Sequence, residues 1–285
     1  MRLRTMTEAD IPAGMRLKEV SGWNQTTQDW KRFLNASPLG CLVAEVDSRV
    51  VGTAATIPYE DKFAWIGMVL VDPEYRGRGI GTRLLEKTIA YLDETKIPTM
   101  KLDATPQGRP LYEKLGFVKE YEIERLILER GPEQLPNSRV TSAQGRISNA
   151  ELETVVARDR ELFGANRSDL LKSLYQEAPE LTLTVLNNGE LQGYVFGRKG
   201  SFADQMGPFM ATDIETCRTL VAAFLHGSVR ENVIVDCLKS HTVAGDLLRQ
   251  LGFRYSRPLT RMFRGNNRCP GKHGELCAIL GPEFG

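Results

Sequence analysis

The chain of 285 residues is long enough for one large domain or two ordinary ones, and its hydrophobic content of 41% is typical of globular proteins. A formal net charge of +1 argues against nucleic-acid binding, which usually requires a strongly basic domain. No run approaches the roughly 18 apolar residues of a membrane span, and no apolar segment follows the first charged residues. We therefore expect a cytoplasmic protein with neither a membrane nor a nucleic-acid partner.

The first half of the chain alternates short apolar segments with amphipathic ones. Periodicity predicts one strand, two helices, three strands, a long helix, a further strand and a short helix. In chain order these segments are residues 2–5, 8–20, 27–35, 41–46, 50–58, 63–71, 80–96, 100–104 and 110–115. The turn at 47–49 makes a hairpin of the second and third strands.

A glycine-rich turn leads from the apolar segment 63–71 into the long helix. It reads Arg76-Gly77-Arg78-Gly79-Ile80-Gly81-Thr82. Its alternating glycines leave backbone N–H groups accessible to an anion, and the positive end of the helix points to the same place. The spacing fits neither a P-loop nor Gly-x-Gly-x-x-Gly. The turn therefore predicts a phosphate-binding loop of another kind, with Arg76 and Arg78 adding positive charge.

The motif Arg-x-x-Gly-x-Gly at 76–81, together with Leu111-Tyr112-Glu113-Lys114-Leu115-Gly116-Phe117, resembles the GCN5-related N-acetyltransferases (GNAT family). The resemblance covers the first half of the chain well and the rest more faintly. It implies an α/β fold with a mixed, mostly antiparallel sheet flanked by helices. It also implies acetyl-CoA as co-substrate, without a metal, its thioester entering a gap between the fourth and fifth strands.

The resemblance assigns roles to residues of the first half. Those implied to bind acetyl-CoA are Val69, Leu70, Val71, Arg76, Gly77, Arg78, Gly79, Ile80, Gly81, Thr82 and Thr105. Main-chain N–H groups of 69–71 would polarise the thioester carbonyl. Tyr112 stands where many relatives have the tyrosine that protonates the departing thiolate, and the alternative is an aromatic residue that fills the helix–sheet interface.

The resemblance implies that the acceptor side is built from the connection between the first two helices and the loop before the fourth strand. Here these segments contain Trp23, Tyr59 and Glu60. The two aromatic residues suit an apolar part of the acceptor, although Trp23 equally suits a core position. Asp103, at the carboxyl end of the fifth strand, and the loop acids are the nearest carboxylates, and solvated turn residues are the alternative interpretation.

The layout of the first half recurs in the second. Leu115-Gly116-Phe117 returns as Leu251-Gly252-Phe253, each after a short strand and an apolar helix. Continuing from each motif reaches Arg125 and Arg261 at the same separation. The chain is therefore predicted to contain two tandem domains of the same family.

The second copy lacks the predicted chemistry. The segment after 207–211 is short and without glycine, and it contains Asp213 and Glu215, which would repel a phosphate and instead cap the following helix. Leu248 stands at the position of Tyr112. We therefore predict a degenerate second domain.

A Pro/Gly/polar stretch at 131–138 has the composition of a linker. We predict a catalytic domain at 1–131 and a degenerate domain with a tail at 139–285. Shaping the acceptor cleft, packing on the first domain and forming a homodimer are the roles left open for the second domain.

The five cysteines include no Cys-x-x-Cys pair. Cys269, His273 and Cys277 are evenly spaced, but the spacing matches no common zinc pattern. We expect reduced thiols, no metal, and an apolar run at 276–280 that packs against the body of the protein.

These observations predict an acetyl-CoA-dependent N-acetyltransferase in which a primary amine of a small molecule attacks the thioester directly. Two alternatives stay open: acetylation of protein lysines or N-termini, and a non-catalytic regulatory protein that binds CoA.

Overall fold

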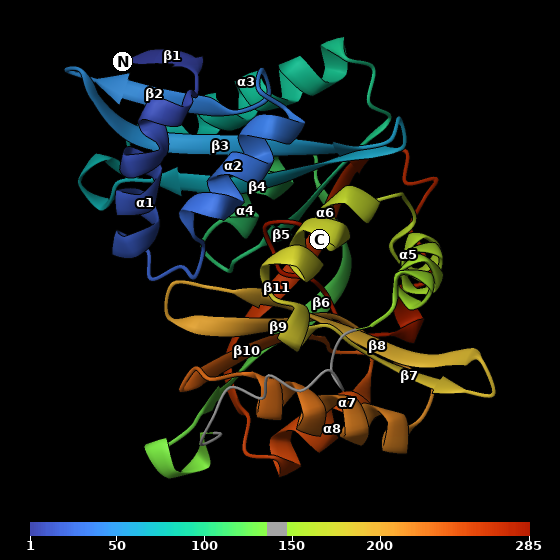
Figure 1. Ribbon diagram of the computed structural model, residues 1–285. Helices are drawn as coiled ribbons and strands as arrows, with labels where there is room; N and C mark the ends of the chain where they lie inside the picture. The colour runs from blue at the N-terminus through green and yellow to red at the C-terminus, as the bar shows by residue number, and fades with distance from the viewer. Residues whose placement is uncertain (136–146) are drawn as a thin grey trace. The chain divides into compact units, whose positions relative to one another are not determined.

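A computed structural model describes residues 1–135 and 147–285, which form two compact units (Figure 1). Unit 1 comprises Met1–Glu120, Arg261–Cys269 and Phe284, and unit 2 comprises Tyr121–Thr260, Pro270–Glu283 and Gly285. The units depart from the predicted division at 131 and 139, because residues 121–130 belong to unit 2 and 261–269 to unit 1. Part of the predicted linker, 136–138, lies outside the described residues.

Unit 1 is built on a mixed sheet. Its helices are α1 (Ile11–Val20), α2 (Thr27–Ala36), α3 (Ile80–Glu94) and α4 (Arg109–Lys114). Its strands are β1 (Arg2–Thr5), β2 (Leu42–Val46), β3 (Arg49–Tyr59), β4 (Phe63–Val71) and β5 (Thr99–Ala104). They lie in sequential order, followed by the last residues of β11 (Arg254–Gly265). Neighbouring strands from β1 to β4 are antiparallel, and β4 and β5 are parallel.

Local sequence explains this arrangement. Asp47 and Ser48 both have positive φ, 48° and 61°, as the tight hairpin between β2 and β3 requires. Strand β3 is buried along most of its length because helices cover both faces of the sheet. In Figure 1, α1 and α2 lie in front of this sheet and α3 lies behind it. The predicted mixed, mostly antiparallel sheet flanked by helices is confirmed.

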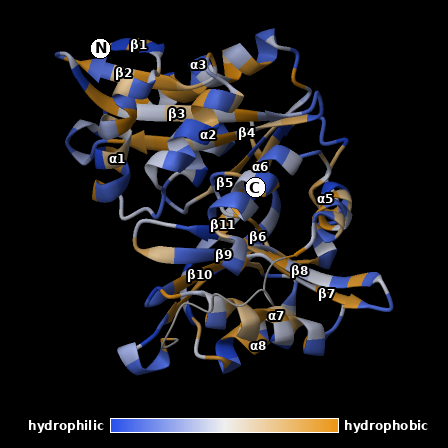
Figure 2. Ribbon diagram, in the orientation of Figure 1, coloured by the Kyte–Doolittle hydropathy of each residue, from blue (hydrophilic) through white to orange (hydrophobic). Residues whose placement is uncertain are grey.

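Unit 2 repeats the design. Its helices are α5 (Asn149–Phe163), α6 (Ser168–Glu177), α7 (Ile214–Gly227) and α8 (Thr242–Gln250). Its strands are β6 (Val118–Glu129), which unit 2 shares from Tyr121 onward, β7 (Leu183–Asn187), β8 (Glu190–Lys199), β9 (Ala203–Ala211), β10 (Asn232–Leu238) and β12 (Leu276–Ala278). The strand order is β6-β10-β12-β9-β8-β7. Figure 2 shows hydrophobic residues concentrated on the strands, with hydrophilic residues on the outer surfaces of the helices.

The repeated Leu-Gly-Phe motif ends α4 and α8 in the same way. Phe117 N–H donates to the Tyr112 carbonyl and Phe253 N–H to the Leu248 carbonyl, each at 3.0 Å. The glycine in each motif has positive φ, which is the helix C-cap that glycine adopts with least strain. The two motifs are therefore structurally equivalent, as the internal repeat predicts.

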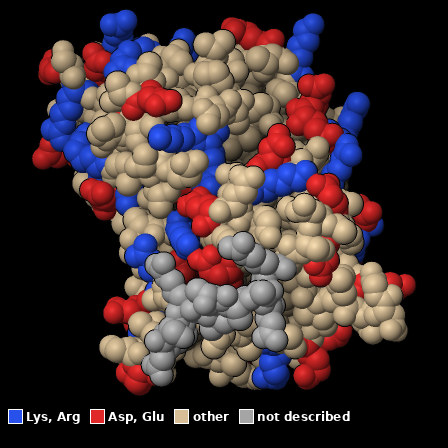
Figure 3. Space-filling view, viewed as in Figure 1, with Lys and Arg blue, Asp and Glu red and all other residues tan. Residues whose placement is uncertain are grey.

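The surface carries charges of both signs. On the face in Figure 3, lysine and arginine side chains are interspersed with aspartate and glutamate. Among the helices of residues 1–135 and 147–285, none combines the length and apolar composition that crossing a bilayer requires.

Candidate active site

A gap opens between β4 and β5 in unit 1. The two strands pair at Ala64–Met100 and Trp65–Lys101, and the described pairing ends there. Beyond it, Met68 has a φ of 55°, and its carbonyl accepts a hydrogen bond from Thr53 Oγ1 at 2.7 Å. This irregularity coincides with a register shift between β3 and β4. The structure thus separates the carboxyl ends of β4 and β5 at residues 69–71, where the family resemblance expects a gap.

The glycine loop between β4 and α3 is open on its outer side. Gly77 and Gly79 have φ values of 75° and 74°, which favour glycine, and a Cβ at either would meet no atom within 4 Å. Gly79 is the N-cap of α3, and no side chain among the described residues caps this helix. The first-turn N–H groups, from Ile80 to Thr82, therefore meet the requirements of an anion-binding site.

Asp72 holds the start of this loop. Its buried carboxylate accepts hydrogen bonds from Arg16 at 2.7 Å, Arg49 at 3.0 Å and the Glu74 N–H at 3.2 Å. The bond from Arg16 contributes most to lowering the pKa of Asp72. The carboxylate therefore stays ionised and fixes the chain as it leaves β4.

The two loop arginines are exposed and hydrogen-bonded to nearby main chain. Arg76 Nε donates to the Val71 carbonyl at 3.1 Å, and Arg78 donates to the Glu74 carbonyl at 3.1 Å. The Arg78 guanidinium also lies over the Tyr75 ring, 4.9 Å from its centroid. Both side chains place positive charge beside the glycine loop, as the sequence predicts.

Tyr112 lies on α4 among buried apolar side chains of β5 and α3. Its ring meets Phe117 edge to face, with centroids 6.0 Å apart. A Cβ at position 108 would come within 2.9 Å of the Tyr112 ring, so Gly108 makes room for it. Burial raises the pKa of Tyr112 to about 12, and the phenol is therefore protonated at neutral pH. This environment is compatible with both roles considered for Tyr112, a proton donor and a residue that packs the helix–sheet interface.

Thr105 stabilises the turn that precedes α4. Its Oγ1 accepts a hydrogen bond from the Gly108 N–H at 3.3 Å. Its role toward acetyl-CoA stays a prediction.

The face of the unit 1 sheet opposite α3 is lined by Tyr59, Phe63, Trp65, Lys101 and Asp103, and we call it the aromatic face. Their neighbours along β4 and β5 point the other way, into the core with α3. The rings of Tyr59 and Phe63 lie 5.7 Å apart, and the Lys101 ammonium lies 5.0 Å from the Phe63 ring.

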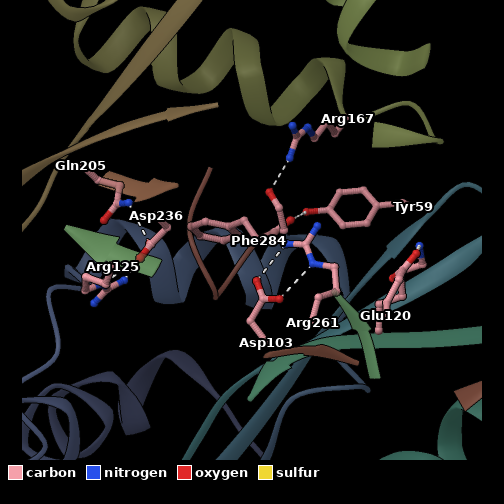
Figure 4. Close-up of polar contacts among 11 residues, drawn as sticks. Tyr59, Asp103, Glu120, Arg125, Arg167, Gln205, Asp236, Arg261 and Phe284 are labelled. Carbon is pink, nitrogen blue, oxygen red and sulfur yellow. Dashed lines mark hydrogen bonds and ion pairs between the residues drawn. The ribbon is translucent and has the colours of Figure 1, made fainter. Parts of the chain in front are cut away.

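An arginine that sequence reasoning did not place lies on this face. Arg261, from β11, donates to both carboxylate oxygens of Asp103 at 2.9 and 2.8 Å (Figure 4). Its guanidinium lies 4.5 Å from the Trp65 ring. The Asp103 side chain is fully buried, so its charge is balanced within the fold before any acceptor arrives.

The sequence contained a signal for this pair. Arg125, the counterpart of Arg261 in the repeat, binds Asp236 of β10 in the same two-pronged way, with both distances 2.8 Å. Asp236 is thus the counterpart of Asp103. The repeated arginine was visible in the sequence, but its partner was not.

Lys101 was also missed. Its buried ammonium lies 3.3 Å from Glu120 Oε1, and burial lowers the pKa of Lys101. An isolated lysine within a predicted strand gave no indication of this pair.

The predicted acceptor residues occupy different environments. Tyr59 is buried, and its hydroxyl donates to the Phe284 carbonyl at 2.8 Å. Glu60 lies in the exposed β3–β4 turn, 3.0 Å from the Lys62 ammonium. Trp23 is half-buried between α1 and α2. The structure joins Tyr59 and Asp103 on the aromatic face and places Glu60 on a turn; the roles of all four toward an acceptor stay predictions.

Unit 2 has the equivalent gap, but a strand fills it. β9 and β10 pair in parallel from Ala203–Asn232 to Met206–Val235. Past that point β12 lies between them, with Ala278 opposite both Phe209 and Cys237. This confirms that the apolar run at 276–280 packs into the body.

A glycine permits the approach of this segment. A Cβ at Gly207 would overlap the Ile279 carbonyl oxygen, and the φ of 151° is one that L side chains rarely adopt. Ile279 N–H in turn donates to the Asp236 carbonyl at 3.0 Å.

Helix α7 provides its own cap. Asp213 Oδ1 accepts from the Thr216 N–H at 2.8 Å, and this bond contributes most to lowering the pKa of Asp213. Leu248, at the position of Tyr112, is fully buried in the core. The predicted helix cap is confirmed. In unit 2 the cap stands in place of the open helix N-terminus of unit 1, and a buried leucine stands in place of Tyr112.

The cysteine–histidine spacing near the end of the chain forms no cluster. Cys277 is buried in β12, and His273 stacks on Tyr121 with centroids 4.6 Å apart. Among the described residues, no three potential ligands from His, Cys, Asp and Glu come together.

Comparison with known proteins agrees with this geometry. Residues 9–117 match the acetyltransferase (GNAT) family, and residues 155–278 match an acetyltransferase (GNAT) domain. A holothin acyltransferase of Pseudoalteromonas sp. (strain SANK 73390) is 26% identical over 266 residues, covering 92% of this chain and 87% of that protein. An uncharacterized N-acetyltransferase of Bacillus subtilis (strain 168) is 27% identical over 228 residues, covering 77% of this chain and 76% of the relative.

Among solved structures, a protein of Pyrococcus horikoshii provisionally described as an acetyltransferase is similar over the full chain. It has a TM-score of 0.78 and 25% identity, and the match covers 95% of that protein. Both halves of the chain therefore match the same family. This chain belongs to the GNAT acetyltransferases and carries two GNAT domains in tandem.

Proposed function

We propose that unit 1 transfers an acetyl group from acetyl-CoA to a primary amine of a small molecule, by direct attack of the amine on the thioester. The observation that carries this proposal is the uncapped N-terminus of α3 behind the open loop of Gly77 and Gly79. That loop suits a pyrophosphate, because its N–H groups and the helix dipole favour an anion. Acetyl-CoA supplies the acetyl group, already activated as a thioester.

Residues of β4 and α4 are proposed to act on the thioester carbonyl and on the departing thiolate. Main-chain N–H groups of Val69 to Val71 border the gap beside β4, where they suit the pantetheine arm and the thioester carbonyl. Tyr112 holds a proton at its phenol oxygen, because burial keeps the pKa of this side chain high. We propose that this proton is given to the departing thiolate.

The acceptor side supports a small amine with an apolar portion. The aromatic face is formed by the buried side chains of Tyr59, Phe63 and Trp65, and the buried Arg261–Asp103 pair balances its own charge. Apolar walls with a few placed polar groups are typical of small-molecule sites. A relative that matches most of this chain is a holothin acyltransferase.

The test is release of free CoA thiol from acetyl-CoA in the presence of primary amines, amino acids or peptides, with the product identified by mass. We expect turnover with small amines and none with Gly79→Asp. Turnover with peptides alone would identify a protein acetyltransferase. Binding of acetyl-CoA without thiol release from any acceptor would contradict the enzymatic proposal and favour a regulatory protein.

A further inference from the structure

Phe284 is a single residue of the last segment that belongs to unit 1, while Glu283 and Gly285 on either side belong to unit 2. Its ring is fully buried and stacks on Phe33 of α2, with centroids 5.2 Å apart and an interplanar angle of 21°. Its carbonyl accepts the hydrogen bond from the Tyr59 hydroxyl at 2.8 Å. Both the ring and the main chain of Phe284 are therefore fixed within unit 1.

These contacts place Phe284 on the aromatic face. Tyr59 ends β3, and its ring leans on Phe63 at the start of β4. Figure 4 draws the Tyr59–Phe284 hydrogen bond and the Arg261–Asp103 pair. Tyr112 lies in the apolar cluster formed with α3, on the other face of the same sheet. Phe284 thus lines the face of unit 1 that we assign to the acceptor amine.

The way Phe284 is held distinguishes it from an ordinary core residue. The core of unit 1 is formed by its own strands and helices, whereas Phe284 enters alone from a segment outside the sheet. The Tyr59 hydroxyl binds its main chain, so the side chain can change without loss of that hydrogen bond. Such a position can limit the space for a ligand without altering the framework of the site.

We propose that Phe284 determines the size of the acceptor that unit 1 admits, an inference that rests on the proposed function. Its ring forms a wall opposite the amine-bearing end of the acceptor, and together with Phe33 and Tyr59 it contacts the apolar part of that molecule. Removing the ring leaves an apolar cavity, and cavities of this kind accept a ligand group the size of benzene.

The test measures the dissociation constants of primary amines for the enzyme–CoA complex by calorimetry, so it does not depend on turnover. The amines are propylamine, benzylamine and 4-phenylbenzylamine. With Phe284→Ala, we expect 4-phenylbenzylamine to gain roughly tenfold or more relative to propylamine, the scale of discrimination by apolar pockets. With Phe284→Trp, we expect the opposite shift, against the larger amines.

Two controls separate specificity from packing. Phe253→Ala removes the same ring from the core of unit 2 and is expected to leave the ratios among the three amines unchanged. Tyr59→Phe keeps the aromatic ring but removes the hydrogen bond to Phe284, and we expect a smaller shift in the direction of Phe284→Ala.

Equal weakening of all three amines by Phe284→Ala, or the absence of amine binding in the wild-type complex, would overturn the proposal. Loss of thiol release with normal amine binding would instead contradict the proposed catalytic function and leave this inference standing.

Discussion

At the residue scale, two buried side chains of unit 1 differ in their surroundings. Tyr112 lies among apolar groups, and Asp103 lies against an arginine. Tyr112 is surrounded by apolar side chains, and burial favours its neutral form. Asp103 is equally enclosed, but Arg261 supplies two hydrogen bonds and a compensating charge. Tyr112 therefore carries its proton at neutral pH, and Asp103 is held in an ion pair.

Tyr112→Phe removes the hydroxyl and keeps the packed ring. If the phenol protonates the leaving thiolate, kcat and kcat/KM should fall together by roughly a hundredfold or more, while CoA affinity stays unchanged. Because the pKa is about 12, ionisation of Tyr112 should not reduce wild-type activity below about pH 10. Steady-state kinetics against pH checks both statements. Normal turnover by the variant would leave Tyr112 a packing residue.

Arg261→Met should leave the buried Asp103 carboxylate without its compensating charge. Breaking such a pair costs about 3–5 kcal/mol of unfolding free energy, whereas replacing both partners by apolar residues costs much less. Urea denaturation of Arg261→Met and of the double variant with Asp103→Leu measures the difference. Arg125→Met breaks the equivalent pair in unit 2, where Gln205 still donates to Asp236, and is expected to cost less. An Arg261→Met variant as stable as the wild type would contradict the assignment.

The sequence was sufficient to place Tyr112 on the short helix before Gly116, and it was insufficient to place Arg261 beside Asp103. The tyrosine stands at a fixed distance from a helix-ending glycine, so a local motif locates it. The Arg261–Asp103 pair joins residues 158 positions apart, and its formation depends on which unit the end of β11 joins. That choice is made by tertiary packing rather than by any local pattern.

At the scale of elements, helices α3 and α7 begin in opposite ways. The N-terminus of α3 follows two glycines in left-handed conformation and has no side-chain cap among the described residues. The N-terminus of α7 is capped by Asp213. The same helix position therefore has no side-chain acceptor in unit 1, which suits it to an external anion, and already holds a carboxylate in unit 2.

Gly79→Asp and Asp213→Ala should separate these two helix ends. The first places a side chain and a negative charge where the phosphate is expected, at a backbone angle unsuited to aspartate, and should abolish CoA binding. The second should lower the melting temperature and leave CoA affinity unchanged. Calorimetry and thermal denaturation measure the two effects. Weaker CoA binding by Asp213→Ala would contradict the distinction.

Most element boundaries were predictable because they follow local chemistry. Strand β4 matches the predicted segment, and α3 begins at the predicted residue. The position of β12 was not predictable. Its apolar residues indicated burial, but three residues can pair with any exposed strand edge, and the approach at Gly207 is evident only once the chain is folded.

At the scale of the whole molecule, the two family domains retain the same layout and differ in what occupies the gap in the sheet. Unit 1 combines its gap with the glycine loop, whereas unit 2 combines its gap with β12 and a capped helix. Each unit also includes residues that are distant in the chain. The sequential division at 131 and 139 could not anticipate this, because the composition of a linker does not show which unit a distant segment joins.

Calorimetric titration of the full chain with acetyl-CoA should therefore give one site per chain. The expected site is in unit 1, and Gly79→Asp should remove it entirely. Two equivalent sites per chain would contradict the interpretation of unit 2 as degenerate. Binding of one acetyl-CoA per chain by Gly79→Asp would contradict it as well.

The strand β12 has a further consequence, for the dependence of each unit on its surroundings. The stabilisation that a ligand gives a folded protein rises with the logarithm of the free ligand concentration once that concentration exceeds Kd, whereas a segment joined to the same chain is present at a high effective concentration at all times. Unit 1 should therefore become more resistant to heat as acetyl-CoA accumulates. Unit 2, whose gap is filled by the chain itself, should remain equally stable in its presence and absence.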